Sequence, residues 1–284
     1  MDFWKMNGAG NDFLVINNLA GEIPAAQYGT IAKALCERHL SIGADGMMFV
    51  EKPHGDADYR MAFYNSDGSM GEMCGNGARC ICRYGFETGL AGQTQRVETT
   101  AGVVTGEKID RRLYKIRLTD PSVVRLDEPI EVDGKKYDCS YVELGNPGIP
   151  HAVVPISGLA AYPDRELFDL GRKIRYHKAF PKGANVNFYE IMGTDQVLER
   201  TYERGVEDFT YACGTGTGSL VTVLTLQGKV SGKNVRVRMT GGELIIDIDR
   251  SGDRIKNLYL TGPTNVVAKG QITDEDLAFN EKCM

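Results

Sequence analysis

The sequence lacks any apolar run that approaches the ~20 residues needed to span a membrane as a helix. Its opening segment, 1–16, contains charged side chains such as Lys5 and Asp12, so it lacks the unbroken apolar core of a signal peptide. Basic residues are outnumbered, 33 Lys and Arg against 38 Asp and Glu, and they are scattered along the chain. Proteins that bind nucleic acid or anionic membranes carry clustered basic residues. We therefore expect a cytoplasmic protein that binds neither.

Several sequence motifs that indicate a particular class of enzyme are also absent. The sequence contains no P-loop with its lysine, no Rossmann G-x-G-x-x-G and no G-x-S-x-G nucleophile motif. Its seven cysteines are an odd number, which argues against a complete disulfide framework, and they lack the paired spacing of zinc sites. We therefore expect no metal site. Five cysteines are expected to be core or surface thiols: Cys36, Cys80, Cys82, Cys139 and Cys283.

One short string, Cys-Gly-X-Gly, occurs twice. It begins at Cys74 and again at Cys213, an offset of 213 − 74 = 139 residues. Three other landmarks recur at nearly the same offset, which indicates an internal duplication. They are the turns at 100–102 and 240–242 (240 − 100 = 140), the Gly-Ala pairs before Asp45 and Asn185 (185 − 45 = 140), and the strand starts at Asn11 and His151 (151 − 11 = 140).

Each copy is predicted to fold as strand, helix, strand, strand, Cys-Gly-X-Gly, helix and β-hairpin, which is an α+β class. Short β-branched or aromatic runs, such as 59–64 and 235–239, predict strands. Apolar periodicity predicts helices at 28–39, 78–88, 164–176 and 219–227. We place an N-terminal lobe at 1–118, joined by the C-terminal segment 263–284, and a C-terminal lobe at 119–262.

Each repeated cysteine stands where a buried helix is predicted to begin. A helix N-terminus carries unpaired N–H groups and a partial positive charge, which favours the thiolate of a cysteine placed there. The glycines that follow allow a carboxylate to approach those N–H groups. If the two copies face each other, an amino-acid α-carbon lies between the sulfurs of Cys74 and Cys213. One thiolate then removes the α-proton and the other thiol returns a proton from the opposite face, with no metal or pyridoxal cofactor.

Other interpretations stay open at this point. Duplication is purely architectural in many two-lobed proteins. Two such thiols could also form a reversible disulfide in a redox protein, or the site could bind an amino acid without reacting. Outside a motif, Asn11 and Asn65 would be ordinary turn residues, His151 among apolar neighbours would be a core histidine, and Arg204 would be a surface charge.

At these residues the sequence resembles the diaminopimelate epimerase family. The resemblance covers nearly the whole chain and rests on seven stretches: MNGAGNDF at 6–13, SIGADG at 41–46, FYNSDGS at 63–69, MCGNGARC at 73–80, GANVNF at 183–188, YERGV at 202–206 and ACGTGTGS at 212–219. It implies two pseudo-symmetric lobes, each a mostly antiparallel sheet wrapped around a central helix. It further implies an isomerase that converts LL- to meso-diaminopimelate in lysine and peptidoglycan biosynthesis, working without a cofactor as a homodimer.

The resemblance also assigns roles to single residues. Cys74 and Cys213 would be the acid/base pair. His151 and Glu203 would tune the thiols or hold the α-amino group, and Arg204 would bind the distal carboxylate with its planar fork. The substrate would be bound by Asn11, Asn65, Gly75, Asn76, Asn185, Glu203, Arg204, Gly214 and Thr215.

Three positions depart from the family pattern. Ile149 stands where a substrate-binding asparagine is common, with Asn146 three residues earlier as a candidate substitute. Phe209 lies in a segment before the second cysteine that has one extra residue, and Gly46 replaces a glutamine found in some members. These departures leave the two-thiol chemistry intact and bear on the substrate. The alternative is a racemase of the same fold that acts on a different amino acid.

Overall fold

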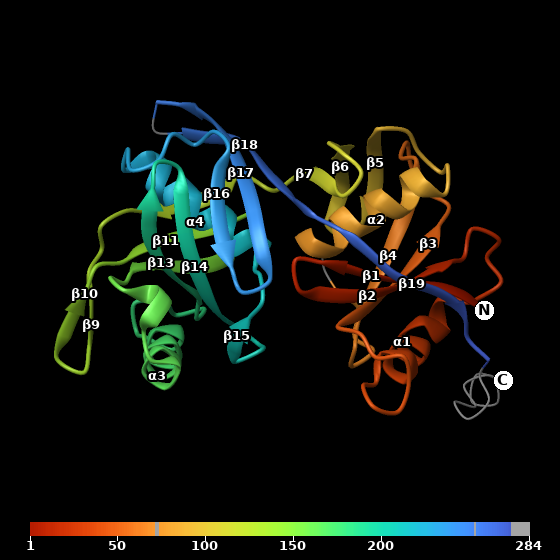
Figure 1. Cartoon of the computed structure of the whole chain (residues 1–284), viewed down its shortest axis with the longest axis horizontal. Coiled ribbons are helices and arrows are strands. Elements are labelled where there is room, and N and C mark those ends of the chain that lie inside the picture. The colour runs from red at the N-terminus through yellow and green to blue at the C-terminus, as the bar shows by residue number, and fades with distance from the viewer. Residues whose placement is uncertain (72–73, 253, 274–284) are drawn as a thin grey trace. The chain divides into compact units, whose positions relative to one another are not determined.

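The computed structural model describes residues 1–71, 74–252 and 254–273 and divides the chain into two compact units (Figure 1). Unit 1 comprises Met1–Ile116 and Gly262–Met284, and unit 2 comprises Arg117–Thr261. Each unit is described by itself below. Among the described residues, no helix is long and apolar enough to cross a membrane.

Unit 1 is a mixed sheet with two helices. In spatial order the strands are β19, β1, β2, β3, β4, β5, β6 and β7, and only the pairs β2–β3 and β4–β5 are parallel. Helix α1 joins the first parallel pair and α2 joins the second, as parallel strands require a crossover. The bounds are β1 Asp2–Gly8, β2 Asn11–Asn17, α1 Tyr28–Cys36, β3 Gly46–Glu51, β4 Tyr59–Asn65, α2 Gly75–Glu87, β5 Thr94–Thr99, β6 Gly102–Lys108, β7 Leu113–Arg117 and β19 Asn265–Gln271.

Unit 2 repeats this topology step by step. Its strands follow the order β8, β11, β12, β13, β14, β16, β17 and β18, and here only β12–β13 and β14–β16 are parallel. The short β15 lies beside β14, and β9 and β10 form a separate hairpin. The bounds are β8 Pro121–Arg125, β9 Ile130–Val132, β10 Lys135–Tyr137, β11 Ser140–Leu144, β12 Ile149–Pro155, α3 Asp164–Arg175, β13 Asn185–Gly193, β14 Gln196–Glu203, β15 Asp208–Thr210, α4 Gly214–Leu226, β16 Val235–Met239, β17 Gly242–Ser251 and β18 Arg254–Pro263. The α+β class and the internal repeat are therefore confirmed.

The two helices of each unit have different roles. In α2 every residue from Gly75 to Gly85 is buried, and α4 is nearly as enclosed, so each is the central helix of its unit. By contrast α1 and α3 bury one face only, at spacings of three and four residues, and each covers a separate apolar cluster. The central helices are buried on nearly all sides because strands surround them.

Both central helices begin before the apolar runs that predicted them. Those runs cover 78–88 and 219–227, whereas the helices begin at Gly75 and Gly214, directly after the two cysteines. Glycine is a poor helix former, so the sequence argument left the glycines outside. Tight packing against the sheet overrides that propensity, as the site below shows. Helix α1 ends at Cys36, earlier than the predicted His39, which has a left-handed φ of 73°.

Candidate active site

The two repeated cysteines occupy the same position in their units. Cys74 is the N-cap of α2, with φ −106° and ψ 119°, and Cys213 is the N-cap of α4, with φ −119° and ψ 102°. The Cys74 carbonyl accepts the Ala78 N–H at 2.8 Å, and the Cys213 carbonyl accepts the Thr217 N–H at 2.9 Å. In each case the extended backbone sets the thiol beside the first-turn N–H groups, which lack intrahelical acceptors. That arrangement suits a carboxylate.

Both first turns pack closely at a glycine. A Cβ on Gly77 would lie 2.5 Å from Met48 Cε and 3.6 Å from Cys74 Cβ. A Cβ on Gly216 would lie 2.2 Å from Asn187 Oδ1 and 3.3 Å from Cys213 Cβ. Each helix start is therefore pressed against the neighbouring strand, which fixes the backbone that carries the cysteine.

In unit 1 a chain of side-chain hydrogen bonds joins the first turns of α2 to the start of β2. The buried Arg79 donates from Nη2 to Asn76 Oδ1 at 2.8 Å, and Asn76 Nδ2 donates to Asn11 Oδ1 at 2.5 Å. Asn11 Nδ2 in turn donates to Asp45 Oδ2 at 3.1 Å. The structure thus brings together the predicted substrate residues Asn11 and Asn76, next to Gly75.

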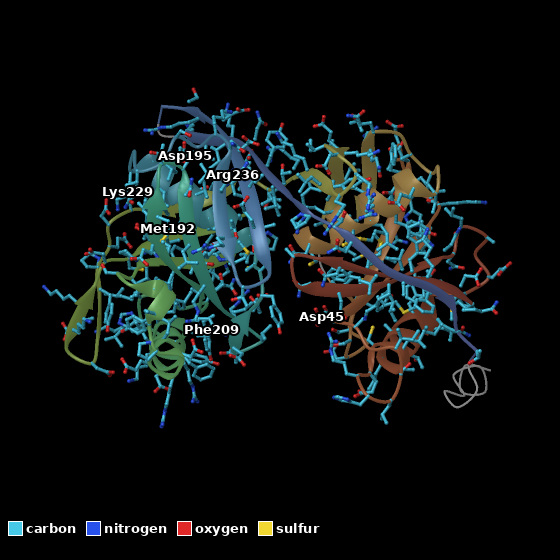
Figure 2. All side chains as sticks on the ribbon, viewed as in Figure 1. Asp45, Met192, Asp195, Phe209, Lys229 and Arg236 are labelled. Carbon is cyan, nitrogen blue, oxygen red and sulfur yellow. The ribbon has the colours of Figure 1, made fainter. Side chains whose placement is uncertain are left out.

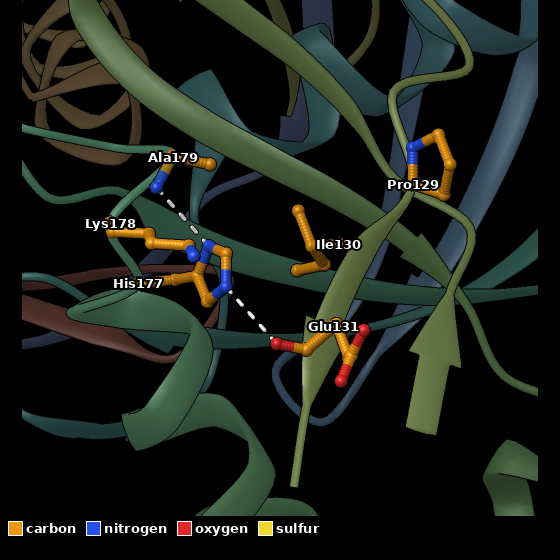
Figure 3. Close-up of a pocket in the computed structure, with 6 residues that line it drawn as sticks. All are labelled: Pro129, Ile130, Glu131, His177, Lys178 and Ala179. Carbon is orange, nitrogen blue, oxygen red and sulfur yellow. Dashed lines mark hydrogen bonds between the residues drawn. The ribbon is translucent and has the colours of Figure 1, made fainter. Parts of the chain in front are cut away.

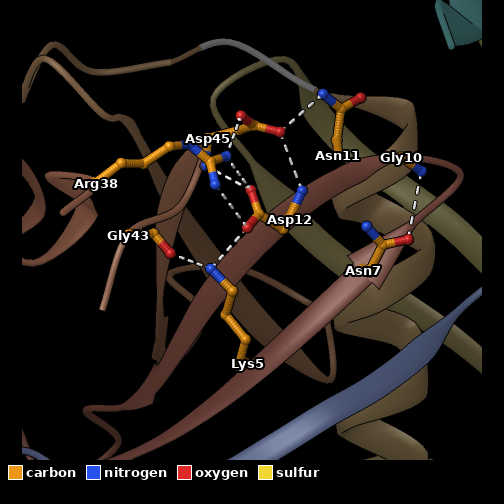
Figure 4. Close-up of polar contacts among 8 residues, drawn as sticks. All are labelled: Lys5, Asn7, Gly10, Asn11, Asp12, Arg38, Gly43 and Asp45. Carbon is orange, nitrogen blue, oxygen red and sulfur yellow. Dashed lines mark hydrogen bonds and ion pairs between the residues drawn. The ribbon is translucent and has the colours of Figure 1, made fainter. Parts of the chain in front are cut away.

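Charged side chains anchor the start of β2, which carries Asn11 (Figure 4). Asp12 pairs with Lys5 at 2.7 Å and with Arg38 at 2.7 Å, and Arg38 also pairs with Asp45 at 2.9 Å. Burial alone would raise the pKa of Asp12, but hydrogen bonds and charge from Lys5 and Arg38 outweigh it and hold the pKa below its ordinary value. Asp12 is therefore a charged structural anchor.

Asn65 takes part in a turn at the end of β4. Its backbone N–H donates to the Ser69 carbonyl at 2.9 Å, and its Nδ2 donates to Ser69 Oγ at 3.0 Å. These contacts are those of the turn residue that the sequence allowed as an alternative.

In unit 2 burial governs Cys213. The residue is 8% exposed, and its Sγ lies 3.6 Å from Thr215 Oγ1. Burial first, and then the nearby Glu203 carboxyl, raise the pKa of the Cys213 thiol well above its ordinary value, although Thr215 and the Gly216 N–H act in the opposite direction. The sequence argument predicted a stabilised thiolate at this helix start. For Cys213 that prediction is wrong, because desolvation outweighs the helix terminus.

Three predicted substrate residues lie together near the ends of β13 and β14. Asn185 Oδ1 accepts the Arg204 N–H at 2.8 Å, and its Nδ2 donates to the Pro150 carbonyl at 3.2 Å. Burial raises the pKa of the Glu203 carboxyl, with a hydrogen bond from Thr210 acting against it. The Arg204 side chain is exposed and donates from Nη1 to the Lys182 carbonyl at 3.1 Å, so most of its donors remain available.

His151 is fully buried in β12, paired with Asn185 of β13. Burial, with the positive charge of Arg204, lowers its pKa to about 3, so the ring is neutral at physiological pH. Asn187 Nδ2 lies 3.1 Å from His151 Nδ1, and Nε2 has no hydrogen-bond partner among the described residues.

The sequence offset aligned His151 with Asn11. That alignment is wrong, because the strand registers place Phe13 in the corresponding position.

Apart from His151, sequence reasoning missed the members of a buried polar group next to Cys213. The group, here called the polar cluster, consists of His151, Asn187, Glu199, Thr201 and Thr217. One signal could have revealed it. Residues 199, 201 and 203 alternate along β14, so two glutamates and a threonine share one face of a strand. A carboxyl on an inward face is uncommon and indicates a specific partner.

The remaining cysteines of the described chain are structural. Burial raises the pKa of four buried thiols to about 12, so they are inert at neutral pH. They are Cys36, Cys80, Cys82 and Cys139. Cys283 lies outside the described residues.

A separate pocket in unit 2 involves none of the predicted site residues (Figure 3). It is lined by residues 129–131 and 177–179. Both ring nitrogens of His177 are engaged, since Nε2 lies 3.1 Å from the Glu131 carbonyl and Nδ1 accepts the Ala179 N–H at 3.2 Å. This histidine closes a loop and has no free nitrogen for chemistry.

Comparison with known proteins identifies the family. A family model described as diaminopimelate epimerase matches residues 3–123 and 144–267. A diaminopimelate epimerase of Aquifex aeolicus is 38% identical, over 98% of this chain and 100% of its own, and one of Archaeoglobus fulgidus is 37% identical, over 98% of both.

The chain belongs to the diaminopimelate epimerase family. This confirms the resemblance found in the sequence and makes the protein an isomerase. Two solved structures share the fold at low identity. A hydroxyproline epimerase from Agrobacterium vitis has a TM-score of 0.68 at 18% identity, covering 96% of this chain and 90% of its own. A PhzF-family protein from Enterococcus faecalis has a TM-score of 0.68 at 14% identity, covering 95% and 98%.

The three departures from the diaminopimelate epimerase pattern have different surroundings. Gly46 has no room for a side chain, because a Cβ would lie 2.5 Å from Phe63 Cε2 and 2.7 Å from the Tyr64 carbonyl. Phe209, labelled in Figure 2, is half-buried and packs edge-on against Tyr202 with ring centroids 6.0 Å apart, so it covers one side of the core of unit 2. Ile149 begins β12, half-buried, and Asn146 is exposed in the preceding turn.

Proposed function

We propose that this protein epimerises LL-diaminopimelate to meso-diaminopimelate, with Cys74 and Cys213 as the two acid/base groups. Membership of the diaminopimelate epimerase family supports the reaction. The observation that carries the residue assignment is the matched N-cap position of the two thiols, each followed by a glycine pressed against a strand. No other cysteine of the described chain has that setting.

The chemistry follows from these groups alone. One thiolate removes the α-proton, and the other thiol delivers a proton to the opposite face of the carbon. The α-carboxylate is bound by first-turn N–H groups at 75–77 and 214–216, which stabilise the negative charge that it gains as the α-proton leaves. A thiol whose pKa is raised by burial is a strong base once ionised, which suits Cys213 to a weakly acidic carbon. We propose that no cofactor takes part.

Substrate recognition is proposed for the amide and charged groups around the two helix starts. Asn76 would help to hold the reacting carboxylate, and Asn11, Asn65 and Asn185 would line the substrate pocket. The exposed guanidinium of Arg204 would bind the distal carboxylate in bidentate fashion. His151 and Glu203 would tune the thiols or hold the α-amino group; His151 would do so as a neutral imidazole.

Hydrogen exchange tests the proposal. The protein is incubated with LL-diaminopimelate in D2O, without added cofactor, and deuterium at the α-carbon is followed by NMR. We expect exchange and inversion in the unaltered chain, and loss of both by at least 10³-fold in Cys74→Ala and Cys213→Ala, given the size of acid–base contributions. Cys139→Ala, which removes a buried core thiol, is the matched control and should keep activity. Full turnover by either N-cap variant would refute the assignment.

A second candidate is a racemase of the same fold with another amino acid as substrate. The filled space at Gly46 and the aliphatic Ile149 favour it, because both positions can carry polar side chains in the family. Exchange measured with diaminopimelate and with single-carboxylate amino acids separates the two. Exchange with no amino acid, together with a Cys74–Cys213 disulfide, would instead support the redox interpretation.

Cell location and assembly are part of the same proposal. We propose that the lobes predicted at 1–118 with 263–284 and at 119–262 form a cytoplasmic enzyme that works as a homodimer on a small-molecule substrate. Sedimentation velocity gives the test of assembly, since a monomer of 31.2 kDa is readily distinguished from its dimer.

A further inference from the structure

The two units differ in the buried residues around the start of the central helix. The start of each central helix rests on one strand residue, Met48 under Gly77 and Asn187 under Gly216. These contacts make Met48 and Asn187 counterparts. Strand pairing then extends the match, since Met48 pairs with Phe63 and Asn187 pairs with Thr201.

Continuing along the strands and helices gives five matched positions. In unit 1 all five are apolar and buried: Phe13, Met48, Met61, Phe63 and Ala78. In unit 2 the same positions hold the polar cluster, which is equally buried: His151, Asn187, Glu199, Thr201 and Thr217. The fold therefore does not need polar groups here, because unit 1 fills the same space with hydrocarbon.

The polar cluster is linked to the cysteine. Thr217 Oγ1 lies 2.6 Å from Glu199 Oε2 and 3.0 Å from the Cys213 carbonyl. On the other side, Thr201 Oγ1 donates to Asn187 Oδ1 at 3.1 Å, and Asn187 Nδ2 lies 3.1 Å from His151 Nδ1. One hydroxyl thus stands between the Glu199 carboxyl and the backbone of Cys213.

The protonation of Glu199 decides which way that hydroxyl points. Among the described residues no cation pairs with Glu199, and burial raises the pKa of its carboxyl to about 8, although the threonine hydroxyls lower it. The hydroxyl lies within hydrogen-bonding distance of both groups, so a neutral Glu199 can donate to Thr217 Oγ1 and leave the Thr217 proton for the Cys213 carbonyl. When Glu199 ionises, the hydroxyl has to donate to the carboxylate instead, because it carries one proton.

We infer that Glu199 is a positioning residue for Cys213, acting through the Thr217 hydroxyl to hold the N-cap and through its charge state to oppose the thiolate. The inference rests on the proposed function, since it gives Cys213 its catalytic task. Other titratable groups face the same thiol or cluster. They are Glu203, which acts on Cys213 directly, His151 within the cluster, and Arg204, which acts on His151.

Thiol alkylation tests the inference without reference to catalysis. Iodoacetamide modification of Cys213 and Cys74 is measured peptide by peptide, by mass spectrometry, between pH 6 and 10. In Glu199→Gln the negative charge is gone, so Cys213 should react about tenfold faster than in the unaltered chain at pH 9, and at nearly the same rate at pH 6.5. Cys74 in the same molecules is the internal reference and should not change between the two proteins.

Turnover gives the second readout. Glu199→Leu removes the hydrogen bond to Thr217 and should lower kcat about tenfold with KM changed less than twofold, whereas Glu199→Gln can still donate to Thr217 and should restore kcat at pH 7. Met61→Leu, at the matched position of unit 1, controls for repacking. Thermal unfolding confirms that each variant is folded.

Two results would overturn the inference: unchanged Cys213 alkylation in folded Glu199→Gln at pH 9, or unchanged kcat in folded Glu199→Leu. If instead the unaltered chain shows no exchange with any amino acid, the proposed function fails, and the alkylation result still decides whether Glu199 acts on Cys213.

Discussion

A Cβ atom added to Gly216 would lie 2.2 Å from Asn187 Oδ1, closer than any real contact of that kind. Asn187 cannot move aside easily, because its amide also contacts His151 and the Ala152 carbonyl at 3.1 and 3.3 Å. The corresponding contact in unit 1 is softer. There Gly77 meets the terminal methyl of Met48, the flexible end of a side chain.

We therefore expect Gly216→Ala to cost more than Gly77→Ala. Overpacking of a rigid site typically costs about 1–3 kcal/mol, so Gly216→Ala should lie at the upper end in the free energy of unfolding and Gly77→Ala below 1 kcal/mol. Urea unfolding monitored by circular dichroism measures both. Equal losses would mean that the amide yields as readily as the methionine.

A second prediction concerns Arg79, which holds Asn76 in the orientation that contacts Asn11. Arg79→Met removes this donor while keeping much of the side-chain volume. Because Asn76 Oδ1 then loses its charged donor, we expect KM for diaminopimelate to rise about tenfold, the loss typical of a charge-assisted hydrogen bond. Arg83→Met is the matched control, since Arg83 is buried one turn further along α2 and donates to Glu87 and the Thr264 carbonyl. Similar KM values for both variants would argue against a positioning role.

Arg204 provides a test of substrate identity. Arg204→Lys keeps the charge and loses the planar fork, so binding of a distal carboxylate should weaken about tenfold. Exchange of a single-carboxylate amino acid should change less than twofold, because that substrate has no group at the distal position. Equal effects on the two substrates would contradict the distal-carboxylate role and favour a general effect on the loop.

The stability of the fold should depend on acid through His151. Its pKa falls from 6.5 to about 3 on folding, so the unfolded chain binds a proton between these values and the folded chain does not. Above pH 6.5 the titration of His151 does not change the free energy of unfolding. As the pH falls from 6.5 towards 3, the free energy of unfolding decreases by about 1.4 kcal/mol per pH unit.

The matched variant is His151→Phe, which copies the residue found at Phe13 in unit 1. It should be less stable at pH 7, because Asn187 loses a partner, yet its unfolding free energy should fall less steeply between pH 6 and 4 than that of the unaltered chain. Guanidinium unfolding at several pH values measures the two slopes. Parallel slopes would show that His151 is not neutral in the folded state.

Much of the fold was accessible from the sequence because it depends on local patterns. The repeat of Cys-Gly-X-Gly at an offset of 139 predicted two copies, and the strand order of the two units agrees. Strand β16 has the predicted bounds, 235–239. The apolar runs left out the glycines of the first turns because helix propensity is local, whereas Gly77 and Gly216 pack against Met48 and Asn187, which lie on strands distant in the sequence.

Some features of the candidate site could likewise be predicted from the sequence, and others depend on tertiary packing. Cys74 and Cys213 could be chosen from spacing, because an N-cap position is set by the residues next to it. The ionisation of Cys213 could not, since burial and the Glu203 carboxyl raise its pKa, and both arise only when β14 packs beside α4. Asn11 of β2 and Asn76 of α2 likewise meet only in the folded unit, because they are 65 positions apart in the sequence.

By itself the sequence determined the duplication, the family and the two thiols, because each is encoded in short contiguous strings whose local geometry is fixed by backbone preferences. Only the tertiary structure decided what surrounds each thiol. The same five positions are hydrocarbon in unit 1 and a hydrogen-bonded polar cluster in unit 2, and a buried group takes its pKa and its partners from neighbours that the chain brings in from distant strands.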